Sequence, residues 1–128
     1  MSGAALISAD WGTTSLRLYL LDAAGTIRDS RASAEGITSV DRGAFAGVLA
    51  AACADWLAAH GRLPALLSGM VGSRQGWVEA PYVGCPAGLD ELAADTVKLE
   101  VPDFSKIVIV PGVDTRDALG IPDVMRGE

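Results

Sequence analysis

The sequence has few of the residues from which metal sites and disulfide frameworks are usually built. It contains two cysteines, Cys53 and Cys85, and a single histidine, His60, in 128 residues. Two cysteines are too few for a disulfide scaffold or a zinc knuckle, so we expect two reduced thiols in a cytoplasmic protein. One histidine provides neither a His-based triad nor a His-rich metal site, and we expect His60 to interact with the end of a helix.

Positive charge and long apolar runs are scarce as well. Ten Lys and Arg residues stand against 16 Asp and Glu residues, which leaves a net charge of −6. Nucleic-acid binding normally requires a basic surface, and this balance argues against it. The longest candidate for a membrane span, residues 44–54, is well short of the roughly 18 apolar residues that a transmembrane helix needs. The sequence therefore predicts neither a nucleic-acid partner nor a membrane partner.

Hydrophobic residues make up 50% of the chain, which is enough to form the core of one domain. Alternating or continuous apolar residues predict strands, and an apolar stripe at three- and four-residue steps predicts a long helix that is capped by Asp41. The expected elements, in order, are strands at 4–9, 15–21 and 26–34, a helix at 41–60, a strand at 65–67, a helix at 89–99 and a last clear strand at 106–110. This order predicts an α/β fold with a mixed sheet flanked by helices.

Three of the predicted strands run into segments that contain glycine. The three segments are Asp10-Trp11-Gly12, Ser68-Gly69 and Pro111-Gly112. Because the carboxyl ends of parallel strands share one edge of an open sheet, we expect a ligand cleft with exposed backbone amides at this edge.

The segment after the first strand has residue types that suit a phosphorylated ligand. The carboxylate of Asp10 can hold Mg²⁺ through water, and Gly12 allows a phosphate to approach the backbone closely. Thr13 and Thr14 add short donors, and Arg17 offers a charged one. The alternative is a tight hairpin in which these polar groups only satisfy turn amides. The chain has no P-loop motif, and no dinucleotide fingerprint follows the first strand.

Residues 69–88 form a second informative segment, because a glycine-rich connection of this length is usually functional or disordered. Its apolar residues argue against disorder. Arg74, Gln75, Trp77 and Glu79 suit a polyol carboxylate, with a guanidinium for the acid, polar groups for hydroxyls and an indole for the carbon face. The alternative is an ordered loop in which an Arg74–Glu79 pair holds the loop's own shape. Arg126 is either a cation of the cleft or a surface charge, and the sequence does not choose between them.

Four motifs, taken together, resemble one family. Residues 10–17 resemble the first phosphate motif of the superfamily of actin, heat-shock chaperones and sugar kinases. Residues 69–82, together with 110–113 and 122–128, resemble the 2-dehydro-3-deoxygalactonokinase family, with the motifs in the same order along essentially the whole chain.

The resemblance implies a fold and an activity that composition does not reveal. It implies that residues 1–128 form a ribonuclease H-like N-terminal lobe of a truncated chain that lacks the C-terminal lobe. The face that would meet the missing lobe is then open, which favours self-association. It also implies transfer of the γ-phosphoryl group of ATP, with Mg²⁺, to the 6-hydroxyl of 2-dehydro-3-deoxy-D-galactonate. By this resemblance, Asp10 holds Mg²⁺ and takes part in catalysis, and Arg74 lies in the pocket that binds the sugar acid. The remaining residues to which the resemblance gives roles are Gly12, Thr13, Thr14 and Arg17 for phosphate, and Gln75, Trp77, Glu79 and Arg126 for the sugar acid.

Three other interpretations of the function of these residues remain open at this point. A non-catalytic nucleotide-binding module of the actin type would use the Asp10 segment alone. A ribonuclease H-like nuclease would also place an Asp on the first strand, but it needs a carboxylate cluster and a basic surface. An inactive structural fragment is the third reading. The general base of a kinase is not assigned, since similar kinases use an Asp outside the first motif.

Overall fold

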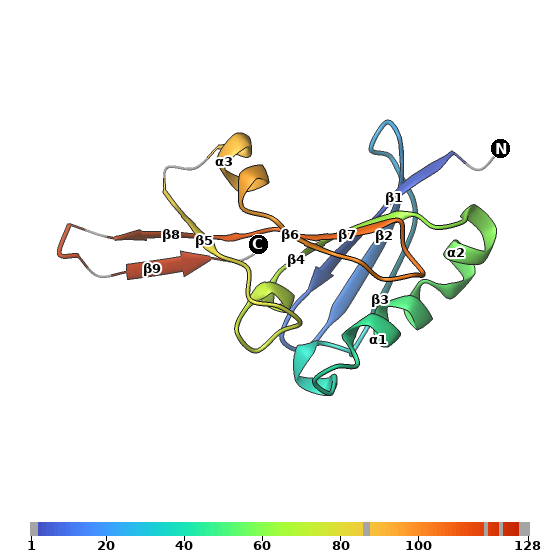
Figure 1. The fold of residues 1–128 in the computed structure, drawn as a ribbon, viewed down its shortest axis with the longest axis horizontal. Helices are drawn as coiled ribbons and strands as arrows, with labels where there is room; N and C mark the ends of the chain where they lie inside the picture. Colours follow the sequence, from blue (N-terminus) through green and yellow to red (C-terminus); the bar gives the residue numbers. More distant parts are fainter. Residues whose placement is uncertain (1–2, 86–87, 117, 121, 126–128) are drawn as a thin grey trace.

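The structure is a computed structural model that describes residues 3–85, 88–116, 118–120 and 122–125 (Figure 1). Its main feature is a six-stranded mixed sheet with the strand order β3-β2-β1-β4-β7-β6. The strands are β1 (Ala4–Trp11), β2 (Leu16–Asp22), β3 (Ile27–Ser33), β4 (Pro64–Ser68), β6 (Val97–Leu99) and β7 (Lys106–Ile109). The predicted α/β fold with a mixed sheet is confirmed.

The first three strands form an antiparallel meander, and the burial of β2 follows the alternation of its apolar residues. In β2, Leu16, Leu18 and Leu20 are buried, whereas Arg17 between them is exposed. β3 is the edge strand and is exposed along most of its length, which fits its charged residues. Charges on an edge strand discourage the addition of a further strand.

β1, β4 and β7 run parallel to one another in the middle of the sheet. Ala9 is paired in register with Leu67 of β4, and Leu67 is paired with Ile109 of β7. All three strands therefore end at the same edge, as expected from the sequence. This edge carries the segment that begins at Asp10 and the segment that begins at Ser68.

The single helix predicted over residues 41–60 is wrong, because two helices occupy that region. They are α1 (Phe45–Ala52) and α2 (Ala54–His60), and Cys53 separates them with φ −106° and ψ 7°. At this break the guanidinium of Arg31 donates a hydrogen bond to the carbonyl oxygen of Ala52, at 3.0 Å. Asp41 does not cap α1, since a turn with a positive φ at Gly43 precedes the helix.

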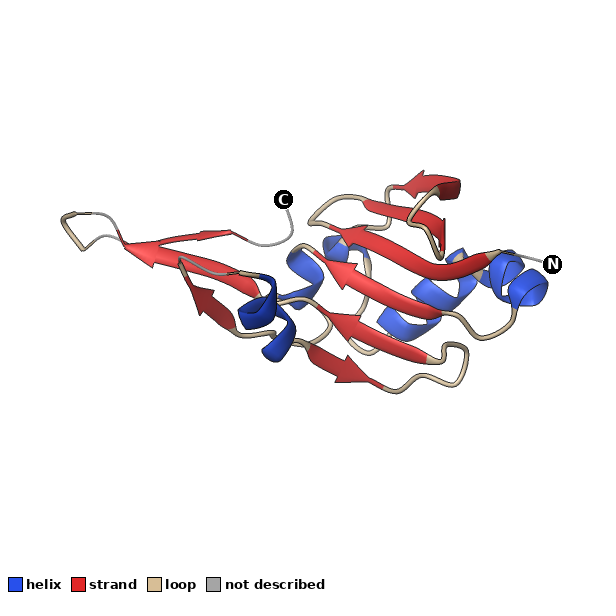
Figure 2. Cartoon of the chain, turned by 90° about the horizontal axis from the view of Figure 1, so that it is seen from above, coloured by secondary structure: helices blue, strands red, loops and turns tan. Residues whose placement is uncertain are grey.

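The core lies between the sheet and the two helices α1 and α2, which lie on one side of the sheet, whereas α3 (Leu89–Ala94) lies on the other (Figures 1 and 2). Large side chains that are almost completely buried fill this layer; they are Ile7, Trp11, Leu16, Leu18, Phe45, Leu49, Leu67, Ile107 and Ile109. Burial of each such side chain stabilises the fold by about 1.5–3 kcal/mol relative to exposure. The apolar core therefore lies on the side of the sheet that faces α1 and α2, and not on the side that faces α3.

The C-terminal half departs furthest from the prediction. The helix expected over residues 89–99 ends after Ala94, and the residues that follow form β6. Strands also occur beyond 106–110: β8 (Gly112–Arg116) and β9 (Pro122–Met125) join β5 (Tyr82–Gly84) in a second, three-stranded sheet. Two short 3₁₀ helices, η1 (Ile37–Ser39) and η2 (Met70–Gly72), complete the described elements. Within the described residues, no helix has the length and apolar character to cross a bilayer.

Candidate functional site

The turn between β1 and β2, residues 10–14, is called the Asp10 turn below. The amide of Gly12 donates to the carbonyl oxygen of Ser15, at 2.9 Å. Residues 36–38 support the turn from outside: the amide of Ile37 donates to the carbonyl oxygen of Gly12, at 3.0 Å. Thr38 donates to the carbonyl oxygen of Thr13 through both its amide, at 3.2 Å, and its hydroxyl, at 2.9 Å. The carbonyl groups of Gly12 and Thr13 are therefore held by the protein itself.

The amides and hydroxyls of Thr13 and Thr14, in contrast, are available to a ligand. Thr13 and Thr14 are exposed, and neither their amides nor their hydroxyls donate a hydrogen bond to any residue that the structure describes. Backbone amides without a protein partner can bind the oxygens of a phosphate. This arrangement suits the predicted phosphate-binding role of Thr13 and Thr14, whereas the amide of Gly12 already donates to Ser15.

Asp10 lies at the edge of the sheet where β1 and β4 end. It is paired in register with Ser68, and Gly69 packs directly against it. A Cβ atom on Gly69 would lie 2.8 Å from the carbonyl oxygen of Trp11 and 3.2 Å from Oδ1 of Asp10. Gly69 also has a φ of +95°, which L side chains rarely adopt. Glycine at this position is therefore required for the close approach of β4 to the carboxylate.

The Asp10 carboxylate makes no hydrogen bond or ion pair with the described residues, and Arg17, which lies opposite it in the β1–β2 register, is exposed and does not pair with it. In the described part of the chain, no group of three or more His, Cys, Asp and Glu side chains could hold a metal ion. Mg²⁺ is commonly held by one or two carboxylates together with waters and substrate phosphates. Asp10 next to a turn with unpartnered amides fits that donor set, whereas it does not fit an all-protein metal cage.

The segment 73–80, called the Arg74 loop below, follows η2 and is anchored to it by backbone hydrogen bonds. The amide of Trp77 donates to the carbonyl oxygen of Val71, at 2.8 Å, and the amide of Ala80 donates to that of Gly72, at 2.7 Å. A Cβ atom on Gly76 would collide with the backbone of η2. The loop is therefore an ordered structure, as its apolar residues predict.

Three polar side chains of the Arg74 loop, those of Arg74, Gln75 and Glu79, face solvent. Arg74 is 90% exposed and its Nε lies 3.5 Å from Oε2 of Glu79, which is 57% exposed. Gln75 is exposed as well. This is the ion pair that the alternative interpretation of the loop expects. An exposed pair contributes only about 0–1 kcal/mol, so Arg74 can exchange Glu79 for another carboxylate at little cost.

Trp77 is placed differently from the other three predicted pocket residues. It is half-buried, and its ring stacks on that of Phe45, with the ring centroids 6.2 Å apart and the planes 11° apart. At least one face of the indole is thus occupied by the protein. Phe45 in turn meets Trp11 edge-on, with centroids 5.4 Å apart.

The Asp10 turn and the Arg74 loop are therefore neighbours. The chain passes from β4 through Gly69, which contacts Asp10, into η2 and then into the loop. The rings of Trp11, Phe45 and Trp77 form a second connection between them through the core. Figure 1 shows the segment after β4 beside the turn that joins β1 to β2. No sequence motif pointed to the support of the turn by residues 36–38 or to the contact of Phe45 with both site segments.

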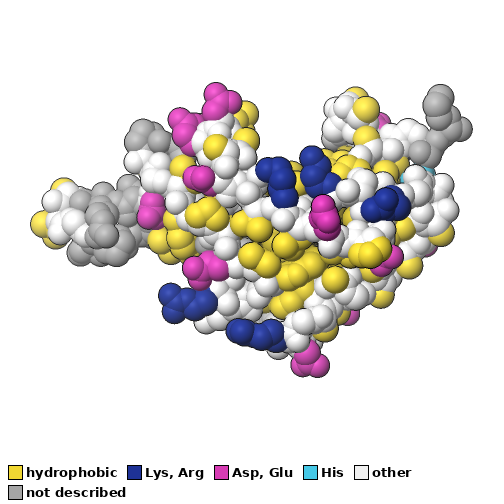
Figure 3. Space-filling view, viewed as in Figure 1, with side chains coloured by type: hydrophobic (Ala, Val, Ile, Leu, Met, Phe, Trp, Pro, Cys, Tyr) yellow, Lys and Arg dark blue, Asp and Glu magenta, His cyan; other side chains and the backbone are white. Residues whose placement is uncertain are grey.

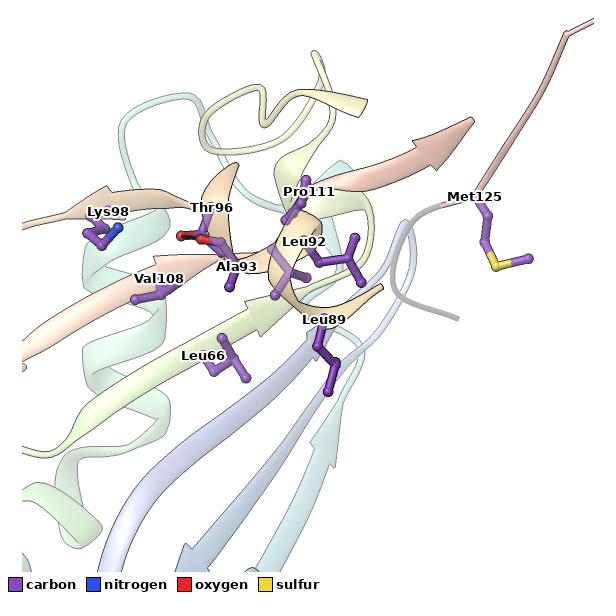
Figure 4. Close-up of a pocket in the computed structure, with 10 residues that line it drawn as sticks. Leu66, Leu89, Leu92, Ala93, Thr96, Lys98, Val108, Pro111 and Met125 are labelled. Atoms are coloured by element: carbon purple, nitrogen blue, oxygen red, sulfur yellow. Dashed lines mark hydrogen bonds between the residues drawn. The ribbon is translucent and has the colours of Figure 1, made fainter. Parts of the chain in front are cut away.

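A hollow of about 590 Å³ lies elsewhere, between α3 and the other side of the sheet (Figure 4). Aliphatic side chains dominate its lining, which consists of Leu66, Leu89, Leu92, Ala93, Thr96, Lys98, Val108, Val110, Pro111 and Met125. Figure 3 shows hydrophobic side chains gathered across the middle of the molecule, with charged side chains around them. The hollow contains none of the predicted site residues, and its lining does not suit a phosphate. Arg126, the remaining predicted cation, lies outside the described residues.

A model of the 2-keto-3-deoxy-galactonokinase family matches residues 10–128. The chain belongs to this family. It is 41% identical over 94% of its length to a Rhizobium meliloti protein named "Probable 2-dehydro-3-deoxygalactonokinase DgoK1". It is 34% identical over 95% of its length to the Escherichia coli 2-dehydro-3-deoxygalactonokinase.

A solved structure supports the same relationship. The crystal structure of a Sinorhizobium meliloti protein assigned as a 2-dehydro-3-deoxygalactonokinase matches 95% of this chain with a TM-score of 0.80 and 39% identity. In every one of these three cases the match covers 39% of the other protein. The chain therefore spans about two fifths of the length of the family members that it matches.

Proposed function

We propose that the chain is the N-terminal lobe of a kinase that transfers the γ-phosphoryl group of ATP to the 6-hydroxyl of 2-dehydro-3-deoxy-D-galactonate. The names of the two relatives support the sugar acid and the phosphoryl transfer. The observation that carries the proposal is the position of the Asp10 turn, with the free amides of Thr13 and Thr14, next to the Arg74 loop. The ribonuclease H-like character of the lobe and its place in a cytoplasmic protein belong to the same proposal.

The Asp10 turn has the groups that the nucleotide side of this reaction needs. The amides and hydroxyls of Thr13 and Thr14 would bind the terminal phosphates, and Gly12 leaves room for them beside the backbone. Asp10 would hold Mg²⁺ through its waters, and the ion would neutralise charge on the phosphate oxygens. Arg17, which is exposed on β2 beside the turn, would add positive charge at the rim.

The Arg74 loop would bind the sugar acid. Arg74 would release Glu79 and take the carboxylate of the substrate, because a bidentate guanidinium–carboxylate pair in a closed site is stronger than an exposed one. Gln75 and Glu79 would accept or donate hydrogen bonds to the hydroxyl groups. Trp77 would present the part of its ring that Phe45 does not cover, and Arg126 remains a predicted second cation.

In the reaction, the bond between the γ-phosphorus and the β–γ bridging oxygen of ATP breaks, and a bond from that phosphorus to the 6-oxygen forms. The 6-hydroxyl loses its proton to a general base, which is not assigned within this chain. The matched proteins have three fifths of their length outside the matched region. We infer that this remainder completes the nucleotide site, so that the chain by itself is inactive.

The proposal is tested in the complete two-lobe enzyme with Asp10→Asn. This change is isosteric and keeps the packing against Gly69, but it removes the negative charge. We expect kcat to fall on the order of 100-fold, as for other groups that stabilise transition-state charge, and the affinity for the sugar acid to change little. Asp103→Asn is the control, because Asp103 is exposed and makes no hydrogen bond with the described residues.

Measured rates of phosphorylation with and without the sugar acid also separate the kinase from a nucleotide-binding module. A kinase consumes ATP in proportion to added 2-dehydro-3-deoxy-D-galactonate. ATP hydrolysis that ignores the sugar acid would contradict the proposal, and so would an unchanged kcat in Asp10→Asn.

A further inference from the structure

The proposed reaction places a demand on the geometry between two segments of the site. Phosphoryl transfer requires the acceptor hydroxyl to lie in line with the phosphate, and displacement by about 1 Å can cost on the order of 100-fold in rate. The phosphate is proposed to lie on the Asp10 turn and the acceptor on the Arg74 loop. Some part of the fold must therefore hold these two segments at a fixed separation.

One side chain touches both segments from a third element. Phe45 is the first residue of α1 and is 3% exposed. Its ring meets Trp11 of the Asp10 turn edge-on at 5.4 Å and 66°, and it stacks on Trp77 of the Arg74 loop at 6.2 Å and 11°. Both arrangements lie within the range of favourable aromatic pairs, each of which contributes about 0.5–1.5 kcal/mol beyond burial.

The two partners of Phe45 are themselves fixed to the backbone at the segments they belong to. The Trp11 indole is fully buried and donates to the carbonyl oxygen of Glu35, at 2.8 Å, next to the residues that support the turn. Trp77 donates its amide to Val71 in η2, at 2.8 Å. A shift of the Phe45 ring would therefore move Trp11 and Trp77, and with them the backbone of the turn and of the loop.

We propose that Phe45 is a positioning residue that sets the separation between the bound phosphate and the bound sugar acid. This inference rests on the proposed function. Phe45 makes its contribution through Trp11 and Trp77, and not by touching either substrate. Its role differs from that of an ordinary core residue because the same ring contacts both halves of the site.

The chain offers a matched control, since Phe104 is its second phenylalanine and is buried to the same degree, at 1% exposure. Among the described residues, Phe104 has no aromatic ring partner. Phe45→Leu and Phe104→Leu therefore remove similar amounts of buried aromatic surface. Only Phe45→Leu removes the contact between the two site segments.

The experiment compares two reactions of the complete enzyme in each variant: phosphoryl transfer to the sugar acid, and the slow hydrolysis of ATP in its absence. For Phe45→Leu we expect kcat/KM for the sugar acid to fall at least tenfold, while hydrolysis stays within about twofold. For Phe104→Leu we expect the ratio of the two rates to stay at the wild-type value. A purely structural role of Phe45 would lower both reactions together, and that result, or no change in either, would overturn the inference.

A second pair of variants covers the case in which Phe45→Leu does not fold. Phe45→Tyr keeps a ring between Trp11 and Trp77, whereas Phe45→Met fills the same space with a flexible side chain that has no ring. We expect the fold reduction in the ratio of transfer to hydrolysis to be at least five times larger for Phe45→Met than for Phe45→Tyr, and equal reductions would overturn the inference. If the wild-type enzyme does not phosphorylate the sugar acid at all, the proposed function itself fails. If it does and the ratio is insensitive to these changes, only the role of Phe45 fails.

Discussion

Two separate constraints require glycine at position 69, and substitution of Gly69 tests how closely β4 must approach Asp10. Its backbone conformation, φ +95° and ψ −159°, is one that only glycine adopts readily, and its Cα faces Trp11 and Asp10. Gly61 has almost the same conformation, φ 84° and ψ −165°, but a Cβ atom there would meet nothing within 4 Å. The two positions therefore separate backbone strain from steric collision.

We expect Gly61→Ala to lower the free energy of unfolding by about 1–3 kcal/mol, the usual cost of such a backbone conformation. Gly69→Ala should lower it by more, because the new methyl group would also push against the carbonyl oxygen of Trp11. Urea denaturation of this chain measures both values. Equal losses for the two variants would mean that the contact with Asp10 relaxes without cost.

The two cysteines should differ sharply in reactivity. Cys53 is fully buried between α1 and α2, and burial raises the pKa of its thiol to about 12, whereas Cys85 is exposed. Since the thiolate is the reactive form, a thiol reagent at pH 8 should label Cys85 quickly and Cys53 only after unfolding. Mass spectrometry after native and denaturing labelling checks this. The Cys85→Ser variant should show no rapid labelling, and rapid labelling of that variant would contradict the expected burial.

The same burial has a consequence for alkaline stability. The pKa of Cys53 is higher in the folded state than the usual value of 9.0, so folding favours the protonated thiol. Its contribution is therefore fully present below about pH 9 and is lost progressively as the pH rises toward 12. We expect Cys53→Ala to show a smaller loss of stability than the wild type between pH 8 and pH 10.5, measured by urea denaturation.

Among the elements, the exposed edge strand β3 is tied to α2 by a cluster around Arg31. The guanidinium donates to both carboxylate oxygens of Asp55, at 2.8 and 3.1 Å, and lies 3.9 Å from the ring centre of Trp56. The Trp56 indole donates to Asp29 in β3, at 2.9 Å. A strand with little apolar surface of its own is thereby attached to the helix layer by polar contacts.

This cluster predicts acid sensitivity. The Arg31 guanidinium lowers the pKa of Asp55, and the hydrogen bond from Trp56, followed by that from the backbone of Ser30, lowers the pKa of Asp29. Because both pKa values lie below the ordinary value of 3.8, the stabilisation is present above that pH and is lost as the pH falls through the lowered values. We expect the urea midpoint of Asp55→Asn to fall less than that of the wild type between pH 5 and pH 2.5. Asp103→Asn serves as the control and should follow the wild type.

The same elements explain which parts of the fold the sequence could predict. Strands whose apolar residues alternate or run continuously, such as β2 and β4, appear where their patterns place them, because each pattern reports burial directly. The division of the long helix at Cys53 has no local signal in an alanine-rich stretch, since it involves Arg31, which is distant in sequence. β8 was missed because it pairs with β5, which is distant in the chain, and β9 was missed with it because it pairs only with β8.

At the scale of the whole molecule, the sequence predicts those parts of the site that follow from the order of the strands and from local motifs. Parallel strands that end at one edge bring Asp10 and Gly69 together, and the motif of Asp10 is local. The support from residues 36–38 and the ring of Phe45 were not predictable, because they depend on how α1 and η1 pack on the sheet. The ion pair of Arg74 with Glu79 was foreseen only as the alternative to a pocket.

The isolated chain should fold without being an enzyme. Its core joins the six-stranded sheet to α1 and α2 in one continuous cluster, so one cooperative unfolding transition is expected in circular dichroism and in tryptophan fluorescence. The Asp10 turn and the Arg74 loop are both present, but the matched relatives have three fifths of their length outside this region. We therefore expect no phosphorylated sugar acid from the isolated chain under conditions in which the complete enzyme turns over many times, with ³¹P NMR as the measurement. Turnover by the isolated chain at a rate near that of the complete enzyme would show that the second lobe is not needed for the chemistry.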